Sequence, residues 1–460
     1  MRKEYDDRLS RWERYLIVGL GLFVLVFGWI VLQRSAYMQD RHTDAGVYFR
    51  AAWAIQSGES IYQVRDDNGM PYVSTPFLAM LLTPLADPPT GTPSGKRGYS
   101  LSYPVSVVVN YLLSVAAIFA AMHILASAIE SQSRNLNLRD HPRYGRRWWT
   151  LRALPIIVCA PMVGSTLSRG QPTHYILLCI VLMTVAFMRG RSVLAGWWLA
   201  AAVCIKVFPA YLVLYPLWRR DLRCLLACAA GLMVGFLVLP AVIMGPARTI
   251  ATYQEYVRFF LYPAFSGVDS IGNARWWDEI YGHTQSFKAV FFRLTYPDPM
   301  QRPAVIPRVF WVVHITLSIV VMIVSLRAAG WTRRQTPLAN GTEALISLLF
   351  AGVLITGVLP MIPASRDHYF SLGTILVMAL LAVGWRHTDR FILPSRWIVL
   401  FSAIFLFQLA VQTSRIGVVD DLGNVIWAEM LLWSAGIYQL WKLTQPRFAT
   451  RPLHTANTRS

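Results

Sequence analysis

The chain has 460 residues, of which 55% are hydrophobic and only 15% are charged, and its mean hydropathy is +0.43. Ordinary soluble domains are roughly 25% charged, so this composition excludes a soluble globular protein and indicates a polytopic membrane protein. The net charge of +19 is explained by topology and by contact with anionic lipid rather than by nucleic-acid binding.

A series of apolar runs follows along the chain. A helix that crosses about 30 Å of hydrocarbon needs roughly 20 residues, and shorter half-helices are tolerated where they line a cavity. The runs cover residues 15–33, 103–126, 153–168, 172–188, 193–205, 208–218, 223–244, 306–329, 343–360, 368–385, 396–414 and 425–441. We therefore expect an all-α polytopic membrane protein with about twelve transmembrane helices.

The first run follows several basic residues, an arrangement that secretory signals share. It is long and no small-residue cleavage site follows it, so we expect a permanent helix with a cytoplasmic N-terminus. The positive-inside rule then places the basic cluster at residues 134–152 inside and two large segments, residues 34–102 and 245–305, outside. The prediction is one membrane domain, residues 1–442, with a disordered cytoplasmic tail, residues 443–460.

Asp44 is the most informative residue on the external side, where it follows the first run. A carboxylate near lipid is costly, so it is either solvated by accident or held there to move a proton or bind a cation. Residues 45–57 have the apolar spacing of a short helix lying on the membrane surface, with Gly58 as its stop. Asp44 would begin that helix, where an Asp also serves as an N-cap. Both roles stay open at this point.

Three further external positions carry polar or structural signals. Residues 74–84 form a short apolar segment with proline near both ends, and we expect it to pack on the bundle or to dip into the interface. Arg169 and Gln171 flank a glycine turn, where they either bind an anionic head group or snorkel to the surface. Lys206 lies at the turn of a hairpin, and a cation there either binds a lipid-linked phosphate or anchors the helix.

The later external loops contain two more clusters. Residues 282–286 (Gly-His-Thr-Gln-Ser) follow tryptophans that are typical of an interfacial belt and also of sugar-binding platforms. Arg366, Asp367 and His368 are adjacent at the entrance of a predicted helix, where together they could hold a phosphate and tune a proton. All five cysteines fall inside predicted helices, and no Cys/His spacing resembles a zinc site.

These signals form an ordered set across the external side. Its members are Asp44 with Tyr48, Gly58 and Tyr62, then residues 72–76 (Tyr-Val-Ser-Thr-Pro), Gly170 with Gln171, Ala195 with Gly196, Lys206 with Pro209, residues 283–286 and residues 365–368. The set resembles glycosyltransferase family 87, the polyprenyl-phosphate-mannose-dependent mannosyltransferases of the GT-C class, over residues 40–385. His283 stands where the family usually has Asn and Arg366 where it usually has Trp, which leaves the acceptor and the exact donor open.

The resemblance implies a GT-C-like bundle whose external loops carry short interfacial helices. It implies an inverting transfer of a hexose, mannose in the first place, from a polyprenyl phosphate to a hydroxyl of a glycolipid or glycan. The reaction would take place on the periplasmic or external face of the inner or plasma membrane, with both termini cytoplasmic. A sugar hydroxyl is a poor nucleophile, so Asp44 would act as the general base.

The departing phosphate needs cations and amide donors. The candidates for binding the donor phosphate or sugar are Lys206, Arg366, His368, Gln171, Gln285 and Arg169, with Asp367, His283, Tyr48 and Tyr62 in support. No Asp-X-Asp cluster lies outside, so we expect a lipid-linked sugar as co-substrate, with no nucleotide sugar, no metal and no cofactor. Membrane lipids are the other expected partners, and nucleic acid is not.

Two other classes stay open. A transporter or flippase of lipid-linked saccharides would explain the helices and Lys206, but it predicts charges in mid-helix and internal repeats. A ligase or polymerase that consumes polyprenyl-diphosphate-linked glycans would share a large external loop, but it usually relies on Arg and His clusters rather than on an early Asp.

Overall fold

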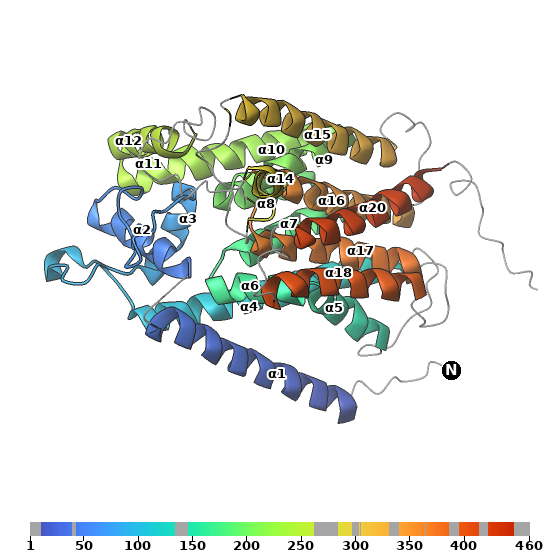
Figure 1. The fold of residues 1–460 in the computed structure, drawn as a ribbon, viewed down its shortest axis with the longest axis horizontal. Coiled ribbons are helices and arrows are strands. Elements are labelled where there is room, and N and C mark those ends of the chain that lie inside the picture. Colours follow the sequence, from blue (N-terminus) through green and yellow to red (C-terminus); the bar gives the residue numbers. More distant parts are fainter. Residues whose placement is uncertain are drawn as a thin grey trace, which may run out of the picture.

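The computed structural model describes residues 11–38, 43–133, 146–261, 284–296, 303, 305–330, 340–363, 365–385, 395–413 and 422–445. Within these residues the regular elements are helices, and strand-like pairing is limited to two isolated bridges, Arg65 with Pro71 and Thr284 with Arg366. The all-α class predicted from the sequence is confirmed (Figure 1).

The helices follow the apolar runs of the sequence. The first half forms α1 (Arg11–Leu32, continued as a π-helix, Gln33–Tyr37), α2 (Ala45–Ser57), α3 (Pro76–Leu81), α4 (Tyr103–Ser133), α5 (Arg146–Val158), α6 (Ala160–Arg169), α7 (Thr173–Met188) and α8 (Ser192–Ile205). The second half forms α9 (Leu214–Arg219), α10 (Leu222–Met233), α11 (Leu239–Met244), α12 (Pro246–Tyr256), α14 (Phe287–Thr295), α15 (Ile306–Ala328), α16 (Asn340–Val358), α17 (Thr374–Trp385), α18 (Ser395–Thr413) and α20 (Asn424–Thr444). Two 3₁₀ segments, η5 (Phe208–Val213) and η11 (Asp367–Gly373), contribute residues to a cleft that is the candidate active site.

Six helical segments of the described chain are long and apolar enough to cross a membrane: Glu13–Tyr37, Tyr103–Ser131, Leu222–Met244, Val309–Ala328, Glu343–Met361 and Asp367–Gly384. The bent pair α5–α6 adds a seventh, and α7, α8 and most of α18 are shorter apolar helices. The larger number of spans expected from the sequence therefore stays a prediction. Residues 208–218 wind as η5 and the six-residue α9, which are too short to form a span of their own.

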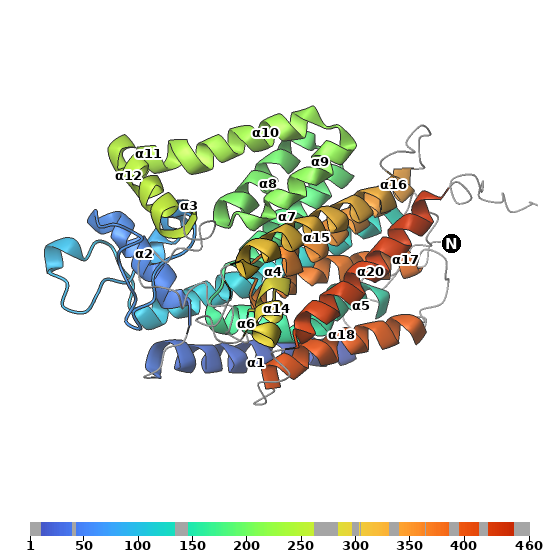
Figure 2. The same cartoon turned by 45° about the horizontal axis from the view of Figure 1, so that its top comes forward.

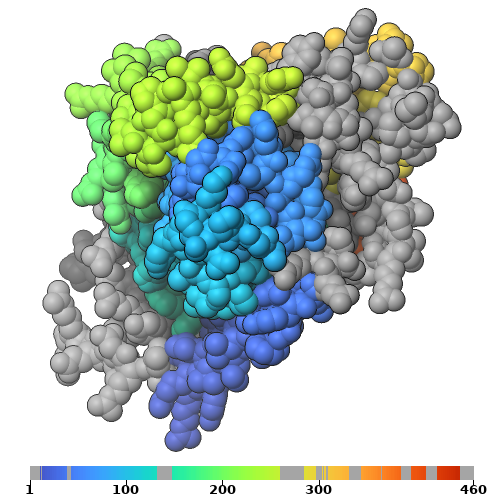
Figure 3. Space-filling model, turned by 90° about the vertical axis from the view of Figure 1, so that its left-hand side faces the viewer, coloured from blue at the N-terminus to red at the C-terminus, as the bar shows by residue number. Residues whose placement is uncertain are grey.

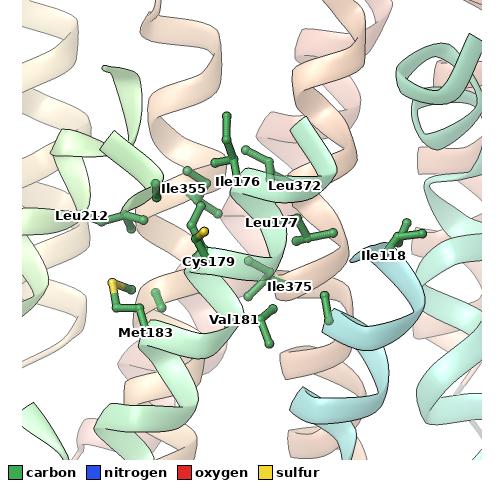
Figure 4. Close-up of a cluster of buried hydrophobic side chains, with 14 of the residues drawn as sticks. Ile118, Ile176, Leu177, Cys179, Val181, Met183, Leu212, Ile355, Leu372 and Ile375 are labelled. Atoms are coloured by element: carbon green, nitrogen blue, oxygen red, sulfur yellow. The ribbon is translucent and has the colours of Figure 1, made fainter. Parts of the chain in front are cut away.

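The core of the bundle is built around α7 (Figure 4). This helix is apolar on all sides, which is the pattern of a helix buried all round. Ile176 and Leu177 of α7 are fully buried, in one cluster with Ile118 of α4, Ile355 of α16 and Ile375 of α17. Close packing around α7 fixes the turn that precedes it, residues 170–172. This turn carries Gln171, which lines the candidate active site.

The run at residues 153–168 is broken, contrary to the single span expected from the sequence. α5 and α6 meet at Cys159 with a bend of 68°. Pro155 lies inside α5 and Pro161 in the first turn of α6, and a proline removes a backbone donor and favours a kink. The bend places the end of α6 next to the start of α2.

α2, α3, α11 and α12 form a cap on one end of the bundle (Figures 1 and 2). Figure 3 looks onto this end, where the blue segment that follows α1 and the yellow-green α11 and α12 make up much of the surface. The predicted bounds of α2 are confirmed, with Gly58 in the left-handed region at its end. Its predicted place is wrong, because α2 is buried from Ala45 to Ile55 instead of lying on the surface with one face exposed.

Polar contacts attach α12 to α2. The Arg248 guanidinium of α12 donates to the carbonyl oxygens of Ala54, Ile55 and Glu59, at 2.7, 3.0 and 2.6 Å. The C-terminal carbonyls of a helix carry partial negative charge, so a cation there stabilises the helix end. The two external segments predicted from the sequence are thus joined into one cap.

Candidate active site

A cleft lies where the cap meets the bundle, with a cavity volume of about 240 Å³. Of the residues expected from the sequence, those that line it are Asp44, Tyr48, Gln171, Lys206, Arg366 and His368. The rest of the lining is Val47, Met70, Pro71, Val73, Ser74, Thr75, Val207, Phe208, Tyr256, Ile362 and Tyr369. Residues that are far apart in the sequence therefore meet in one place.

Asp44 immediately precedes α2, and its backbone N–H donates to the Arg169 carbonyl oxygen at 3.1 Å. Its side chain makes no capping hydrogen bond to α2. Instead the carboxylate oxygen Oδ2 accepts a hydrogen bond from Nε2 of Gln171. The half-buried carboxylate faces the cleft, so the structure does not show the N-cap that the sequence left open.

Gly170 makes the tight turn between α6 and α7 possible, because its φ of 68° lies in the left-handed region that favours glycine. The N–H groups of Gly170 and Gln171 donate to the carbonyls of Leu167 and Thr166 at 3.2 and 3.1 Å, the two bonds of a Schellman motif. A Cβ added to Gly170 would lie 2.7 Å from the Cβ of Ala45. The turn therefore packs directly against the first residue of α2.

The amide of Gln171 joins three side chains. Its Oε1 accepts from the Tyr48 hydroxyl at 2.8 Å and from the Lys206 ammonium at 3.0 Å, and its Nε2 donates to Asp44. Gln171 and Tyr48 are each only 4% exposed, so these bonds form largely away from water. A buried polar network in which each bond is satisfied holds its members rigidly.

Lys206 follows the last residue of α8 in an extended conformation. Its ammonium also donates to the Tyr369 hydroxyl at 2.9 Å and lies 4.4 Å from the centroid of that ring. Tyr369 in turn stacks on Phe208, with ring centroids 5.2 Å apart. An ammonium has three donors, and within the described residues two of them are used, so one is left for a ligand.

η11 is fixed to α6 by two hydroxyl groups. Thr166 Oγ1 donates to the His368 carbonyl at 3.0 Å, and Ser165 Oγ donates to Asp367 Oδ2 at 3.0 Å. Asp367 is fully buried and does not line the cleft, and its Oδ1 lies 3.5 Å from Nδ1 of His368. Asp367 therefore lies behind His368, and His368 faces the cleft.

The charges around Asp44 hold the pKa of its carboxyl below the usual range. Burial by itself would raise this pKa, but the positive charges of Arg366 and Arg169 and the hydrogen bond from Gln171 outweigh it. Asp44 is thus ionised at neutral pH. It can accept a proton or pair with a cation.

The site also carries more positive charge than its carboxylates balance. Arg34, at the end of α1, is close enough for its charge to interact with those of Asp44, Arg169 and Asp367. Within the described residues, the side chains of Arg34, Arg169 and Arg366 make no hydrogen bond or ion pair. A surplus of unpaired guanidinium groups suits a phosphate.

Some expected residues lie outside the cleft. Tyr62 is buried behind the wall of the cleft, where its hydroxyl donates to the Ser74 carbonyl at 3.1 Å. Gln285 is fully buried, and its backbone N–H donates to the Ser365 carbonyl at 2.7 Å. Arg169 acts on the cleft through its charge and its carbonyl oxygen. His283 lies outside the described residues.

The sequence interpretation did not single out several lining residues. Tyr369 directly follows His368, and Phe208 lies two residues after Lys206, so an aromatic close to each of these predicted site residues was the available signal. Thr75 donates to the Cys204 carbonyl, which ties the motif at residues 72–76 to the end of α8. Tyr256 reaches the cleft from α12, and no local pattern could have predicted it.

No cluster of three or more His, Cys, Asp or Glu side chains that could hold a metal ion occurs in the described part of the chain. The buried cysteines are all free. The polar groups of the cleft are therefore one half-buried carboxylate with cations, amides and hydroxyls around it.

Comparison with known proteins points to one family. The sequence model of glycosyltransferase family 87 matches residues 72–357, a stretch that includes Gln171 and Lys206. The chain is 24% identical over 476 residues to the polyprenol-phosphate-mannose-dependent alpha-(1-2)-phosphatidylinositol mannoside mannosyltransferase of Mycobacterium tuberculosis, covering 99% of this chain and 98% of that protein. Among solved structures, ArnT from Cupriavidus metallidurans in the apo state is similar at 14% identity and a TM-score of 0.35, covering 94% of this chain and 77% of ArnT.

Proposed function

The chain belongs to glycosyltransferase family 87, and on that basis we propose that it moves a hexose, mannose in the first place, from a polyprenyl phosphate to a hydroxyl of a glycolipid or glycan. The relative from Mycobacterium tuberculosis is named for a polyprenol-phosphate-mannose donor and a phosphatidylinositol mannoside acceptor, so these are the first pair to test. The chain is a multi-pass membrane protein. We place it in the inner or plasma membrane, with both termini cytoplasmic and the cleft on the periplasmic or external face.

One observation carries the proposal: the Asp44 carboxylate lies in a cleft that is also lined by Lys206, Arg366 and His368. Transfer from a sugar phosphate requires a base for the incoming hydroxyl and positive charge for the departing phosphate. The cleft offers both. Asp44 accepts a hydrogen bond from the Gln171 amide, and Lys206 donates one to the oxygen of the same amide.

In the proposed step the acceptor oxygen attacks the anomeric carbon from the face opposite the phosphate. The bond from that carbon to the phosphate oxygen breaks, and its electron pair leaves with the phosphate. Asp44 takes the proton of the acceptor hydroxyl as the new glycosidic bond forms. Attack from the opposite face inverts the configuration of the anomeric carbon, as in inverting glycosidases, where a carboxylate activates the nucleophile.

The cations meet the charge that develops on the phosphate. Lys206 offers its remaining donor, Arg366 offers a guanidinium without a partner among the described residues, and Arg169 adds positive field. Because these groups are already in place, we propose that no bound metal is needed for this role. A bound phosphate also offsets the cations that lower the pKa of Asp44, and so makes Asp44 a stronger base once the donor is present.

The size of the cleft indicates which part of the lipid donor it can enclose. Its volume of about 240 Å³ is below the roughly 300–1,000 Å³ of sites that enclose a drug-sized ligand. We propose that the cleft encloses the sugar and phosphate, and that the prenyl chain leaves over Val73 and Val207, which are 47% and 49% exposed at its edge.

The experiment uses the purified full-length protein in lipid nanodiscs. Polyprenyl-phosphate-mannose, polyprenyl-phosphate-glucose and a nucleotide-linked mannose are each offered with a panel of glycolipid acceptors that includes phosphatidylinositol mannosides. We expect transfer from polyprenyl-phosphate-mannose only, unchanged by EDTA. Transfer from the nucleotide sugar, or loss of activity in EDTA that added metal restores, would contradict the proposal.

Asp44→Asn is expected to lower kcat by about 10²- to 10⁴-fold, the usual effect of losing a positioned general base, with donor binding kept. Glu59→Gln is the matched control, because it removes an external carboxylate that pairs, among the described residues, with Lys96 alone and lies outside the cleft. If Asp44→Asn turns over at the wild-type rate, Asp44 is not the base and the mechanism is wrong.

A further inference from the structure

The chemistry of its partners fixes the orientation of the Gln171 amide. Lys206 can only donate a hydrogen bond, so the atom that faces it must be the amide oxygen. The ionised Asp44 carboxylate can only accept, so the atom that faces it must be the amide nitrogen. The opposite flip would bring two donors together at Lys206 and two acceptors together at Asp44. The assignment therefore does not depend on choosing between two similar-looking atoms.

Within the described residues, the protein partners of Gln171 occupy much of its amide. Two hydrogen bonds from Tyr48 and Lys206 fill the usual capacity of the oxygen, and one N–H is given to Asp44. Only the second N–H is left over. A residue that orients sugar or phosphate oxygens needs free donors or acceptors, and Gln171 has few.

We propose that Gln171 is a positioning residue that couples the Asp44 carboxylate to the Lys206 ammonium through a single amide. It holds Asp44 Oδ2 and thereby sets the direction of the other carboxylate oxygen, Oδ1, which has no hydrogen-bond partner among the described residues. It holds Lys206 at the same time and so presents the remaining ammonium donor to the cleft. The inference rests on the proposed transferase function. It explains how the base, Asp44, and the phosphate-binding cation, Lys206, stay at a fixed distance from each other.

The surrounding fold supports this role. The backbone of Gln171 is fixed by the Schellman motif that closes α6, and the Gly170 turn before it packs against Ala45 of α2. Tyr48 lies one helical turn after Asp44 on α2, so α2 contacts the amide at both of its ends. Gln171 is therefore held by three separate elements, α2, the α6–α7 turn and the end of α8.

Two substitutions test the role of the Gln171 amide, one that replaces only its nitrogen and one that removes all of its hydrogen bonds. Gln171→Glu keeps oxygen atoms for Lys206 and Tyr48 but places a second carboxylate beside Asp44. Like charges share a proton and raise the apparent pKa of the pair, so we expect the acidic limb of the kcat profile to move upward by about one pH unit or more. The apparent KM for polyprenyl-phosphate-mannose should also rise, because the new carboxylate pairs with Lys206 and offsets charge that would otherwise meet the phosphate.

Gln171→Met keeps the length of the side chain and removes all of its hydrogen bonds. We expect kcat/KM to fall about 10- to 100-fold, which corresponds to the loss of charge-assisted hydrogen bonds, with KM raised and kcat lowered together. Asn110→Leu is the control, since Asn110 contacts the same turn at the Gly170 carbonyl (3.4 Å) and touches neither Asp44 nor Lys206. It should lower stability and leave the shape of the pH profile unchanged.

The outcomes separate this inference from the proposed function. If Gln171 only fills space, Met is tolerated and the pH profiles of both variants run parallel to that of the wild type, which overturns the inference. If Asp44→Asn is inactive while Gln171→Glu keeps the wild-type acidic limb, only the positioning role is lost. If Asp44→Asn is active, the mechanism itself is wrong.

Discussion

At the scale of single residues, the charges of the protein groups around the cleft do not balance. Lys206 donates to an amide and a hydroxyl, both neutral, and Arg366 has no hydrogen-bond partner among the described residues. Half-buried cations without carboxylate partners lower stability in the free protein. An anionic ligand removes that penalty when it binds, so part of the affinity for the donor phosphate comes from charge that the protein leaves uncompensated.

Among the groups that lower the pKa of Asp44, Arg366 has the largest effect. Because Arg366 also meets the donor phosphate in the proposed mechanism, it links donor binding to pH. A carboxylate with a lowered pKa stays ionised as the pH falls and loses its charge only below the ordinary range. We therefore expect the acidic limb of kcat/KM in the wild type to lie below about pH 4. The limb of kcat should lie higher, because the bound phosphate offsets the cations.

In Arg366→Ala, the acidic limb of kcat/KM should move to higher pH and the apparent KM for the lipid donor should rise about 10- to 100-fold, the loss of one charge-assisted hydrogen bond. Arg97→Ala is the control, because Arg97 is exposed on the same cap and its side chain donates, among the described residues, to the Thr92 carbonyl, away from the cleft. Steady-state assays across pH test both effects. A normal KM together with an unmoved limb would show that Arg366 contacts neither the phosphate nor Asp44.

Some of the site could be predicted from the sequence because rare charges in apolar surroundings are visible there. Asp44, Lys206 and Arg366 stand out in this way, and all three line the cleft. The bond from Gln171 to Asp44 could not be predicted, since it depends on how α6 is turned. Arg34 was missed because an arginine at the end of an apolar run is usually only a flank.

At the scale of elements, α8 is placed by close contact with α10, and Lys206 follows directly at its end. A Cβ on Gly196 of α8 would lie 2.4 Å from the Cys224 carbonyl oxygen and 2.8 Å from the Cys228 nitrogen, both backbone atoms. Small residues allow helix backbones to approach this closely in membranes. The resemblance drew attention to Gly196, and the crossing gives the physical reason for a glycine there.

Gly196→Ala should therefore destabilise the protein by about 1–3 kcal/mol, the usual cost of overpacking. Gly19→Ala in α1 is the matched control, since a Cβ there meets nothing within 4 Å. It should be neutral or stabilise by roughly 0.5–1 kcal/mol, because alanine favours the helix. Thermal unfolding of both variants in the same detergent is the measurement. Equal melting temperatures would mean that the two helices can separate without cost.

Element boundaries were predictable where local chemistry sets them. α2 begins and ends where Asp44 and Gly58 indicate. The burial of α2 was not predictable, since the covering segments come from the loop and from α12, beyond any local window. The break at Cys159 had a visible signal in Pro155 and Pro161, but apolar composition alone made the run look continuous.

At the scale of the whole molecule, the cap and the starts of two helices with basic first turns lie at opposite ends. The cap with α2 and α12 is at one end of Figure 1, and the starts of α1 and α5 are at the other. The positive-inside rule predicts that the end with the starts of α1 and α5 faces the cytoplasm. The sequence could not predict how many helices cross, because short helices buried within the bundle resemble spans in composition.

Sidedness is tested with single cysteines. Ser94→Cys in the cap and Ser395→Cys at the start of α18 are both exposed, whereas the native cysteines are buried. We expect an impermeant maleimide to label Ser94→Cys in intact cells and Ser395→Cys only after permeabilisation. The chain without an added cysteine is the control. Labelling of both positions in intact cells would contradict the arrangement, and the reverse pattern would place the cleft in the cytoplasm.

The wide spacing of the lining residues has a consequence for biosynthesis. Asp44 leaves the ribosome early, while Tyr369 follows roughly 300 residues later, or some tens of seconds at about 5–20 residues per second. During that interval the carboxylate lacks Arg366, and for the first half of it also Lys206. A partly synthesised chain therefore has no reactive cleft, and the protein gains its chemistry only when its last quarter has been inserted.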